Sequence, residues 1–313
     1  MPIEPNLSVE FAGRRLNNPV MTASGTCGYA DELGDFMDVN ILGGLITKSV
    51  SLEPRKGNPM PRIVETDAGM LNAIGLANIG VERFIQEKIP VLKSMSEAGV
   101  AIYVNAVGYT IDDYVAVTER VVEQEAIAGV ELNISCPNVK KGGICFGTDP
   151  ESIAEITAAV KKAAGNKTLI VKLTPTVTDI TVTAKAAADQ GADAISLVNT
   201  FTAMVVDIEK RLPVLANRTG GLSGPAIKPI AVYLVNRVYE SVGKSYGIPI
   251  LGLGGIRTAS DALEFIIAGA STVAIGTSNY IDPACPVKVI DGLRSYCRRQ
   301  DIADIKTLVG SLE

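Results

Sequence analysis

The stretch Glu131-Leu132-Asn133-Ile134-Ser135-Cys136-Pro137-Asn138 joins a strand pattern to a loop that continues as Val139-Lys140-Lys141-Gly142-Gly143. Its first half is the apolar run of a buried strand, and its second half contains the glycines of a loop. Cys136 lies at the junction. Most free cysteines are small buried hydrophobic residues, but a thiol at the C-terminal end of a strand is also a candidate for proton chemistry.

Along the rest of the chain, strand patterns alternate with helix patterns. Eight short apolar runs rich in β-branched residues alternate with eight helical patterns. Strands that are apolar on consecutive residues are typical of parallel sheets covered on both faces. The pattern therefore predicts a (β/α)8 TIM barrel, and a doubly wound sheet is the alternative because periodicity does not show closure. The expected strands are 20–24, 44–49, 102–107, 130–135, 169–173, 194–199, 250–254 and 272–276, and the clearest helices are 81–98, 112–128, 150–164, 180–190, 226–242 and 260–268.

Long insertions follow several of the expected strands. Residues 51–80, 137–148 and 200–224 are predicted to be loops at the C-terminal face, where barrel enzymes carry their active sites. Residues 7–18, ahead of the first strand, have hairpin alternation and are expected to plug the bottom of the barrel. Without a linker, repeat or low-complexity tract, residues 1–313 are expected to form one domain.

Composition narrows the function. The 313 residues are 47% hydrophobic and 20% charged, as in a globular protein, and the net charge of −5 argues against a nucleic-acid surface. Met1-Pro2-Ile3-Glu4 has the pattern of neither a signal peptide nor a membrane anchor, so a cytoplasmic location is expected.

Histidine is absent and the five cysteines are scattered. A Ser-His-Asp triad and the usual catalytic zinc site are therefore excluded, and we expect no metal site. The cysteine spacing also excludes a self-contained iron–sulfur cluster of familiar type. Acid–base chemistry must then fall to Cys, Lys, Asp, Glu or Tyr.

The ends of the expected strands are more polar than a core requires. Because buried polar groups need partners, a ring of polar side chains at one mouth predicts a polar ligand. The ring consists of Ser24, Lys48, Asn105, Asn133, Cys136, Lys172, Asn199 and Thr200, with glycine pairs near the last two strands.

The late glycines indicate what part of that ligand is. Gly254-Gly255 precedes the potential helix cap Thr258, and Gly276-Thr277 repeats the arrangement one strand later. Such turns let backbone N–H groups approach a phosphate, a recurring feature after strands seven and eight of a barrel. The segment lacks the glycine spacing of a dinucleotide fingerprint, so a mononucleotide-like phosphate is expected.

Two lysines leave alternatives open. Lys48 and Lys172 each follow an apolar strand, where a lysine can form a Schiff base, as in an aldolase, or hold its charge against an anionic cofactor or substrate. Asn72, in Met70-Leu71-Asn72-Ala73-Ile74-Gly75-Leu76, lies in a loop too apolar for plain solvent exposure, and this loop is expected to fold over the ligand.

Several motifs together resemble the dihydroorotate dehydrogenase family over essentially the whole chain. They are Asn133-Ile134-Ser135-Cys136-Pro137-Asn138, Asn72-Ala73-Ile74-Gly75-Leu76, Thr219-Gly220-Gly221-Leu222-Ser223-Gly224 and the late glycine pairs. A cysteine at the position of Cys136 resembles the soluble class 1 enzymes, since the membrane-associated class 2 enzymes have serine there. The sequence around Asn72 and the motif Lys141-Gly142-Gly143 are similar to those of the NAD-linked 1B catalytic subunits.

The resemblance implies a barrel that holds one FMN and oxidises (S)-dihydroorotate to orotate in pyrimidine biosynthesis. Cys136 would remove the C5 proton, and the hydride would pass from C6 to FMN. The substrate residues carried over are Lys48, Asn72, Ala73, Ile74, Gly75, Leu76, Asn133, Asn199 and Thr200. The flavin residues carried over are Ser24, Thr47, Lys48, Asn105, Asn133, Lys172, Val198, Gly224, Gly254, Gly255, Gly276 and Thr277.

The resemblance also implies a partner. A second subunit with FAD and a [2Fe–2S] cluster would pass electrons to NAD+, in a heterotetramer built on a homodimer of this chain. The alternatives are a fumarate-using class 1A enzyme, oxidation or reduction of another pyrimidine such as uracil on the same scaffold, a Schiff-base lyase using Lys172 or Lys48, and a non-catalytic flavin-binding module.

Overall fold

The computed structural model describes residues 4–134, 140–141 and 144–313 of a closed (β/α)8 barrel. Eight parallel strands form the ring, and the last strand pairs with the first through Val273 beside Val20. Every residue of these strands is buried, which explains why they read as unbroken apolar runs. The strands are β3 (Val20–Thr22), β4 (Gly44–Ile46), β7 (Ala101–Ala106), β8 (Ile127–Asn133), β11 (Thr168–Lys172), β12 (Ala194–Leu197), β17 (Ile250–Leu253) and β18 (Thr272–Ile275). The predicted barrel is thus confirmed, and closure excludes the doubly wound alternative.

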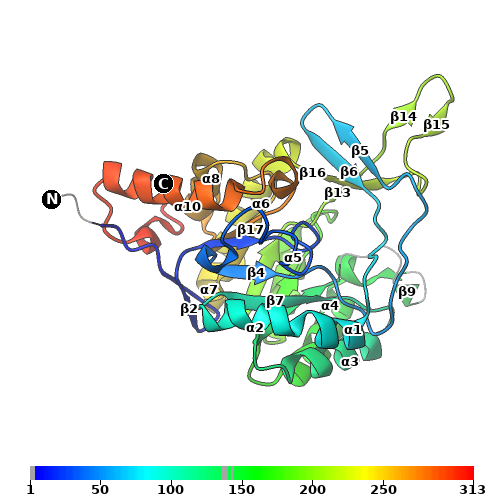
Figure 1. Ribbon diagram of the computed structural model, residues 1–313, viewed down its shortest axis with the longest axis horizontal. Coiled ribbons are helices and arrows are strands. Elements are labelled where there is room, and N and C mark those ends of the chain that lie inside the picture. Colours follow the sequence, from blue (N-terminus) through cyan, green and yellow to red (C-terminus); the bar gives the residue numbers. More distant parts are fainter. Residues whose placement is uncertain (1–3, 135–139, 142–143) are drawn as a thin grey trace.

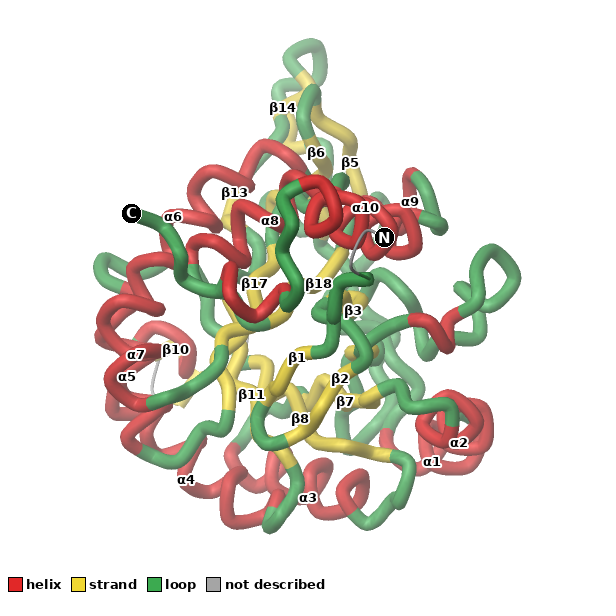
Figure 2. The backbone as a smooth tube through the Cα atoms, turned by 90° about the vertical axis from the view of Figure 1, so that its left-hand side faces the viewer, coloured by secondary structure: helices red, strands yellow, loops and turns green. Residues whose placement is uncertain are grey.

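The helices surround the barrel on its outside (Figure 2). They are α1 (Val81–Glu87), α2 (Ile89–Glu97), α3 (Ile111–Val122), α4 (Pro150–Ala164), α5 (Ile180–Asp189), α6 (Lys228–Val238), α7 (Lys244–Tyr246), α8 (Ala259–Ala268), α9 (Ser278–Ile281) and α10 (Cys285–Arg299). None of the helices in the described ranges is long and apolar enough to span a membrane.

The helices depart from the predicted pattern in three places. The expected helix 81–98 is divided at Lys88, between α1 and α2, with Pro90 in the first turn of α2. The expected helix 226–242 begins with a 3-10 turn (Pro225–Ile227) and ends in a π-helical turn (Tyr239–Gly243). Between β3 and β4, a fully described stretch, the chain forms only the 3-10 turn Val39–Ile41, so the first unit of the barrel has no α-helix.

The predicted N-terminal hairpin is present as β1 (Val9–Phe11) and β2 (Arg14–Leu16), paired antiparallel. Phe11 is fully buried, and its ring meets that of Tyr103 from β7 edge-on at 6.1 Å. Tyr103 lies in the N-terminal half of its strand, so the hairpin packs against the end of the barrel opposite the long insertions (Figure 2).

The long insertions contain strands of their own. β5 (Ile63–Thr66) and β6 (Gly69–Asn72) come from one insertion, β13 (Phe201–Ala203) and β16 (Gly220–Ser223) come from another, and the four form one antiparallel sheet. A second hairpin, β14 (Val206–Asp207) and β15 (Leu212–Pro213), extends outward from this sheet (Figure 1). A third, β9 (Lys140–Lys141) and β10 (Ile144–Cys145), lies in the insertion after β8. Segments almost 150 residues apart thus meet above the C-terminal face, with Asn72 paired to Gly221.

Candidate active site

A cavity of about 560 Å³ lies at the C-terminal ends of the barrel strands. Residues of β6, β13 and β16 contribute to its wall, so the four-stranded sheet covers it. The volume suits a cofactor together with a small substrate. The sequence-predicted residues that line it are Ser24, Lys48, Asn72, Ala73, Ile74, Gly75, Leu76, Asn133, Lys172, Val198, Asn199, Thr200, Gly224, Gly254, Gly255, Gly276 and Thr277.

Three other predicted site residues are placed differently. Thr47 and Asn105 are fully buried behind the cavity wall. The Thr47 hydroxyl donates a hydrogen bond to the carbonyl of Lys48 at 2.9 Å and accepts one from the backbone N–H of Asn105 at 3.4 Å. Cys136 lies outside the described residues, so its place relative to the cavity stays a prediction.

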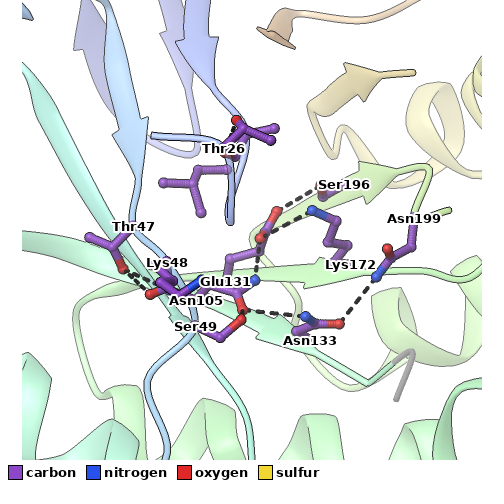
Figure 3. Close-up of polar contacts among 12 residues, drawn as sticks. Thr26, Thr47, Lys48, Ser49, Asn105, Glu131, Asn133, Lys172, Ser196 and Asn199 are labelled. Atoms are coloured by element: carbon purple, nitrogen blue, oxygen red, sulfur yellow. Dashed lines mark hydrogen bonds and ion pairs between the residues drawn. The ribbon is translucent and has the colours of Figure 1, made fainter. Parts of the chain in front are cut away.

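The floor of the cavity is a polar network on neighbouring strands (Figure 3). Its centre is Glu131 of β8, which is fully buried. Asn105 Nδ2 donates to Glu131 Oε2 at 2.5 Å, and Ser196 Oγ donates to Glu131 Oε1 at 2.9 Å. Lys172 Nζ forms an ion pair with the same carboxylate at 3.5 Å. Register explains these meetings, because Asn105 pairs with Glu131 across β7–β8, and Lys172 pairs with Ser196 across β11–β12.

The carboxylate fixes the direction of a row of amides. An ionised carboxylate only accepts hydrogen bonds, so the Asn105 amide must turn its NH2 group toward Glu131 and its oxygen away. That oxygen accepts from Asn133 Nδ2 at 3.3 Å and from Ser49 Oγ at 2.7 Å. Asn133 Oδ1 in turn accepts from Asn199 Nδ2 at 3.3 Å. The amides of Asn133 and Asn199 are therefore held in defined orientations at the edge of the cavity.

Two lysines supply positive charge to the same cavity. Lys172 is 5% exposed and paired with Glu131, while Lys48 has no ion pair in the described part of the chain. Burial lowers the pKa of Lys48, an effect opposed by the nearby carboxylate of Glu32. Both side chains offer donors to an anionic or electron-rich ligand.

Backbone N–H groups gather at the ends of β17 and β18. Within the described chain, those of Gly255, Ile256, Gly276 and Thr277 donate to no acceptor. Four free donors at two adjacent turns form an anion-binding concavity. Gly255 has φ +81° and a Cβ there would lie 2.7 Å from the carbonyl oxygen of Gly224, so a side chain would distort the turn. These features fit the phosphate of a mononucleotide.

The predicted helix cap at Thr258 is also present. Thr258 Oγ1 accepts from the backbone N–H of Asp261 at 3.2 Å, and Asp261 Oδ2 accepts from that of Thr258 at 2.9 Å. This capping box satisfies the first turn of α8 from within the chain. The free donors near the cavity are therefore those of the glycine turns.

The cover is tied to the rim by polar contacts. Asn72 Nδ2 donates to the carbonyl of Gly221 at 3.4 Å, and Thr277 Oγ1 donates to Ser223 Oγ at 2.8 Å. Asn58 Nδ2 donates to the carbonyl of Ala73 at 3.0 Å and so steadies the apolar loop beside Asn72. The covering sheet and the anion-binding turns after β17 and β18 thus form one continuous wall of the cavity.

Several residues of the site were not predicted from the sequence. Glu131 carries the clearest signal, because an acid in an apolar strand two residues before Asn133 must face the same side of the sheet. Ser49 and Ser196 gave no signal beyond being polar. Other polar residues that line the cavity are Thr26, Asn58, Thr148, Thr174, Thr176, Thr202, Asn217, Thr219, Ser223, Ser278 and Tyr280.

The barrel, the anion-binding turns and the polar floor define the class of barrel enzymes that have an anion-binding site at the C-terminal face. The chain belongs to the dihydroorotate dehydrogenase family, whose model, described as "Dihydroorotate dehydrogenase", matches residues 6–296.

Relatives cover the whole chain. A protein of Geotalea uraniireducens (strain Rf4), named dihydroorotate dehydrogenase B (NAD(+)), catalytic subunit, is 50% identical over 309 residues, 99% of each chain. A protein of the same name from Alkaliphilus metalliredigens (strain QYMF) is 52% identical over 307 residues, 98% of this chain and 99% of that one. The crystal structure of DHODH from Eimeria tenella in complex with ferulenol has the same fold, with a TM-score of 0.81 at 24% identity over 99% of this chain and 91% of that one.

Proposed function

We propose that this chain is an FMN-dependent dihydroorotate dehydrogenase that oxidises (S)-dihydroorotate to orotate in pyrimidine biosynthesis. The observation that carries the proposal is the meeting, in one cavity, of free N–H donors at the glycine turns, the Lys172 ammonium and an oriented row of asparagines. The names of the relatives support it, and they do not favour a Schiff-base lyase or another pyrimidine as substrate.

The turns after β17 and β18 would hold the FMN phosphate. Gly254, Gly255, Gly276 and Thr277 would supply the backbone, with Gly224 closing the wall behind Gly255. Ser24, Val198 and Lys172 would contact the flavin, and Thr47 and Asn105 would act from behind the wall. Bound FMN supplies the two-electron acceptor that no side chain can provide.

The substrate would lie against the asparagine row. A pyrimidine ring alternates donors and acceptors at its edge, and each amide of Asn72, Asn133 and Asn199 offers both. Lys48 would bind the substrate carboxylate, since its ammonium has no competing ion pair among the described residues. Thr200 and the loop from Ala73 to Leu76 would close over the ring and exclude water.

Cys136 would be the base that accepts the C5 proton. A free thiol titrates close enough to neutral pH to serve once nearby positive charge or hydrogen bonds favour its thiolate. The described thiols are poor alternatives, since burial raises the pKa of Cys27 to about 12. We expect Cys136→Ser to retain flavin and to lose at least about a hundredfold in turnover, the range typical of general-base catalysis. Unchanged turnover would refute this assignment.

The deciding experiment is the visible spectrum of the purified protein. The proposal predicts a yellow protein that releases FMN on denaturation and whose absorbance bleaches when dihydroorotate is added without oxygen. Dihydrouracil, which can also donate a hydride, serves as the matched control and should not bleach the flavin. A colourless protein, or bleaching by dihydrouracil but not by dihydroorotate, would overturn the proposal.

The identity of the final electron acceptor is a separate part of the proposed function. The relatives are called catalytic subunits, so we infer a second subunit, carrying FAD and a [2Fe–2S] cluster, that relays electrons to NAD+ in a cytoplasmic heterotetramer with a homodimer of this chain at its core. The test assays the isolated chain with fumarate, and then with NAD+ after mixing with a class 1B electron-transfer subunit. Turnover with fumarate alone would identify a class 1A enzyme instead.

A further inference from the structure

Glu131 has no part in the proposed chemistry, yet it is the acid around which the cavity floor is built. Its side chain is fully buried and accepts from Asn105 and Ser196 on the two sides. These two donors fix the carboxylate between β7 and β12, so it has no freedom to turn toward solvent.

The only cation that Glu131 meets in the described chain is Lys172. The Nζ–Oε2 distance is 3.5 Å, and the two side chains are 6% and 0% exposed. A buried ion pair is a poor source of stability, because desolvation offsets the attraction and apolar residues of similar size serve as well. Lys172 lines the cavity and Glu131 is fully buried beside it, so the pair is better explained by its effect on a ligand in the cavity than by stability.

The charges of Lys172 and Glu131 determine in which direction each residue shifts the reduction potential of a bound flavin. An unpaired Lys172 ammonium would raise the reduction potential of the flavin, because little solvent screens its attraction for the negative charge of the reduced ring. The carboxylate beside it offsets most of this attraction while holding Nζ at one position. The pair therefore provides a fixed dipole in place of a full positive charge.

We propose that Glu131 is a positioning residue that sets the reduction potential of the bound flavin by fixing Lys172 beneath the cavity and offsetting its charge. The inference rests on the proposed flavin function and deepens it. Asn105 and Ser196 serve in turn to hold Glu131.

The test compares flavin potentials, measured by equilibration with a reference dye. Glu131→Gln keeps the shape and removes the charge, so the potential should rise, with a change of about tenfold or more in the two-electron reduction equilibrium, or about 30 mV. The matched control is Glu240→Gln, which makes the same change in an exposed pair with Lys244 far from the cavity and should leave the potential unchanged.

A second comparison keeps the inference testable if Glu131→Gln folds poorly. Lys172→Met leaves a lone carboxylate and should lower the potential, and Glu131→Gln/Lys172→Met should raise it again relative to Lys172→Met. The inference would be overturned if Glu131→Gln left the flavin potential unchanged both in the wild-type background and in the Lys172→Met background, as Glu240→Gln should. This result would leave the proposed function standing, provided that dihydroorotate still bleached the flavin. A wild-type protein without flavin would instead overturn the proposed function and this inference with it.

Discussion

The free thiols of Cys27, Cys285 and Cys297 are all buried. Burial raises the pKa of Cys27 to about 12 and that of Cys285 to about 11, and it also raises the pKa of Cys297. At pH 8 a thiol with a pKa of 9.0 is about 10% thiolate, whereas one with a pKa of 12 is about 0.01% thiolate. We expect iodoacetamide at pH 8 to leave these three residues unmodified in the native protein, as peptide mapping by mass spectrometry would show.

The same shifts make stability depend on pH. Above about pH 9 the unfolded chain loses thiol protons that the folded chain keeps, so it binds fewer protons and the free energy of unfolding falls as the pH rises. Cys27→Ala should flatten the fall in melting temperature between about pH 9 and 11. A slope equal to that of the wild type would show that Cys27 ionises as readily in the folded protein.

Which residues meet at the site was largely predictable, because parallel strands bring their C-terminal ends to one mouth. Lys48, Asn133, Lys172 and Asn199 were found in this way. Glu131 was not predicted, because the apolar run around it indicates only a buried strand and does not show which face Glu131 shares with Asn133. Pairing between strands, which joins Glu131 to Asn105, depends on register that no local pattern gives.

Among the elements, the hairpin β1–β2 offers the clearest stability prediction. Phe11→Ala removes a fully buried ring from the closed end of the barrel, and such truncations cost about 3–5 kcal/mol. For a chain of this size the melting temperature should fall by roughly 5–8 °C. Differential scanning calorimetry measures this directly.

Two comparisons sharpen that test. Arg14→Ala lies in the same hairpin, but its side chain is exposed, so the melting temperature should hardly change. The flavin spectrum of Phe11→Ala should also be unchanged below its melting temperature, because the hairpin lies at the end opposite the cavity. A loss of less than about 1 kcal/mol would show that the hairpin does not plug the barrel.

Element boundaries were harder to predict than element types. All eight barrel strands were predicted because both faces are buried, which leaves a continuous apolar run. Helix α10 was not among the six clearest helical patterns, although its buried residues Val289, Ile290, Leu293 and Cys297 form a stripe at helical spacing. The turns between β3 and β4 replace a helix without any sequence marker. The strands of the covering sheet were hidden in glycine-rich loops, since each pairs with a segment far away in the sequence.

For the whole molecule, the expectation of a single domain stays a prediction with a direct test. Each barrel strand is hydrogen-bonded to two neighbours, so opening one pair exposes the core of the whole ring. We expect urea unfolding followed by far-UV circular dichroism and by flavin fluorescence to give one coincident transition. Two separated transitions would divide the chain into independent units.

The covering sheet also constrains how the protein is made. Its strands β6 and β16 are separated by four of the eight barrel strands, and the turns near Gly255 and Thr277, which they adjoin, come later still. A nascent chain on the ribosome therefore lacks a finished pocket until translation is nearly complete. A ligand can therefore be enclosed only after the residues up to Tyr280 have been synthesised, and a product truncated before them would lack part of the pocket wall.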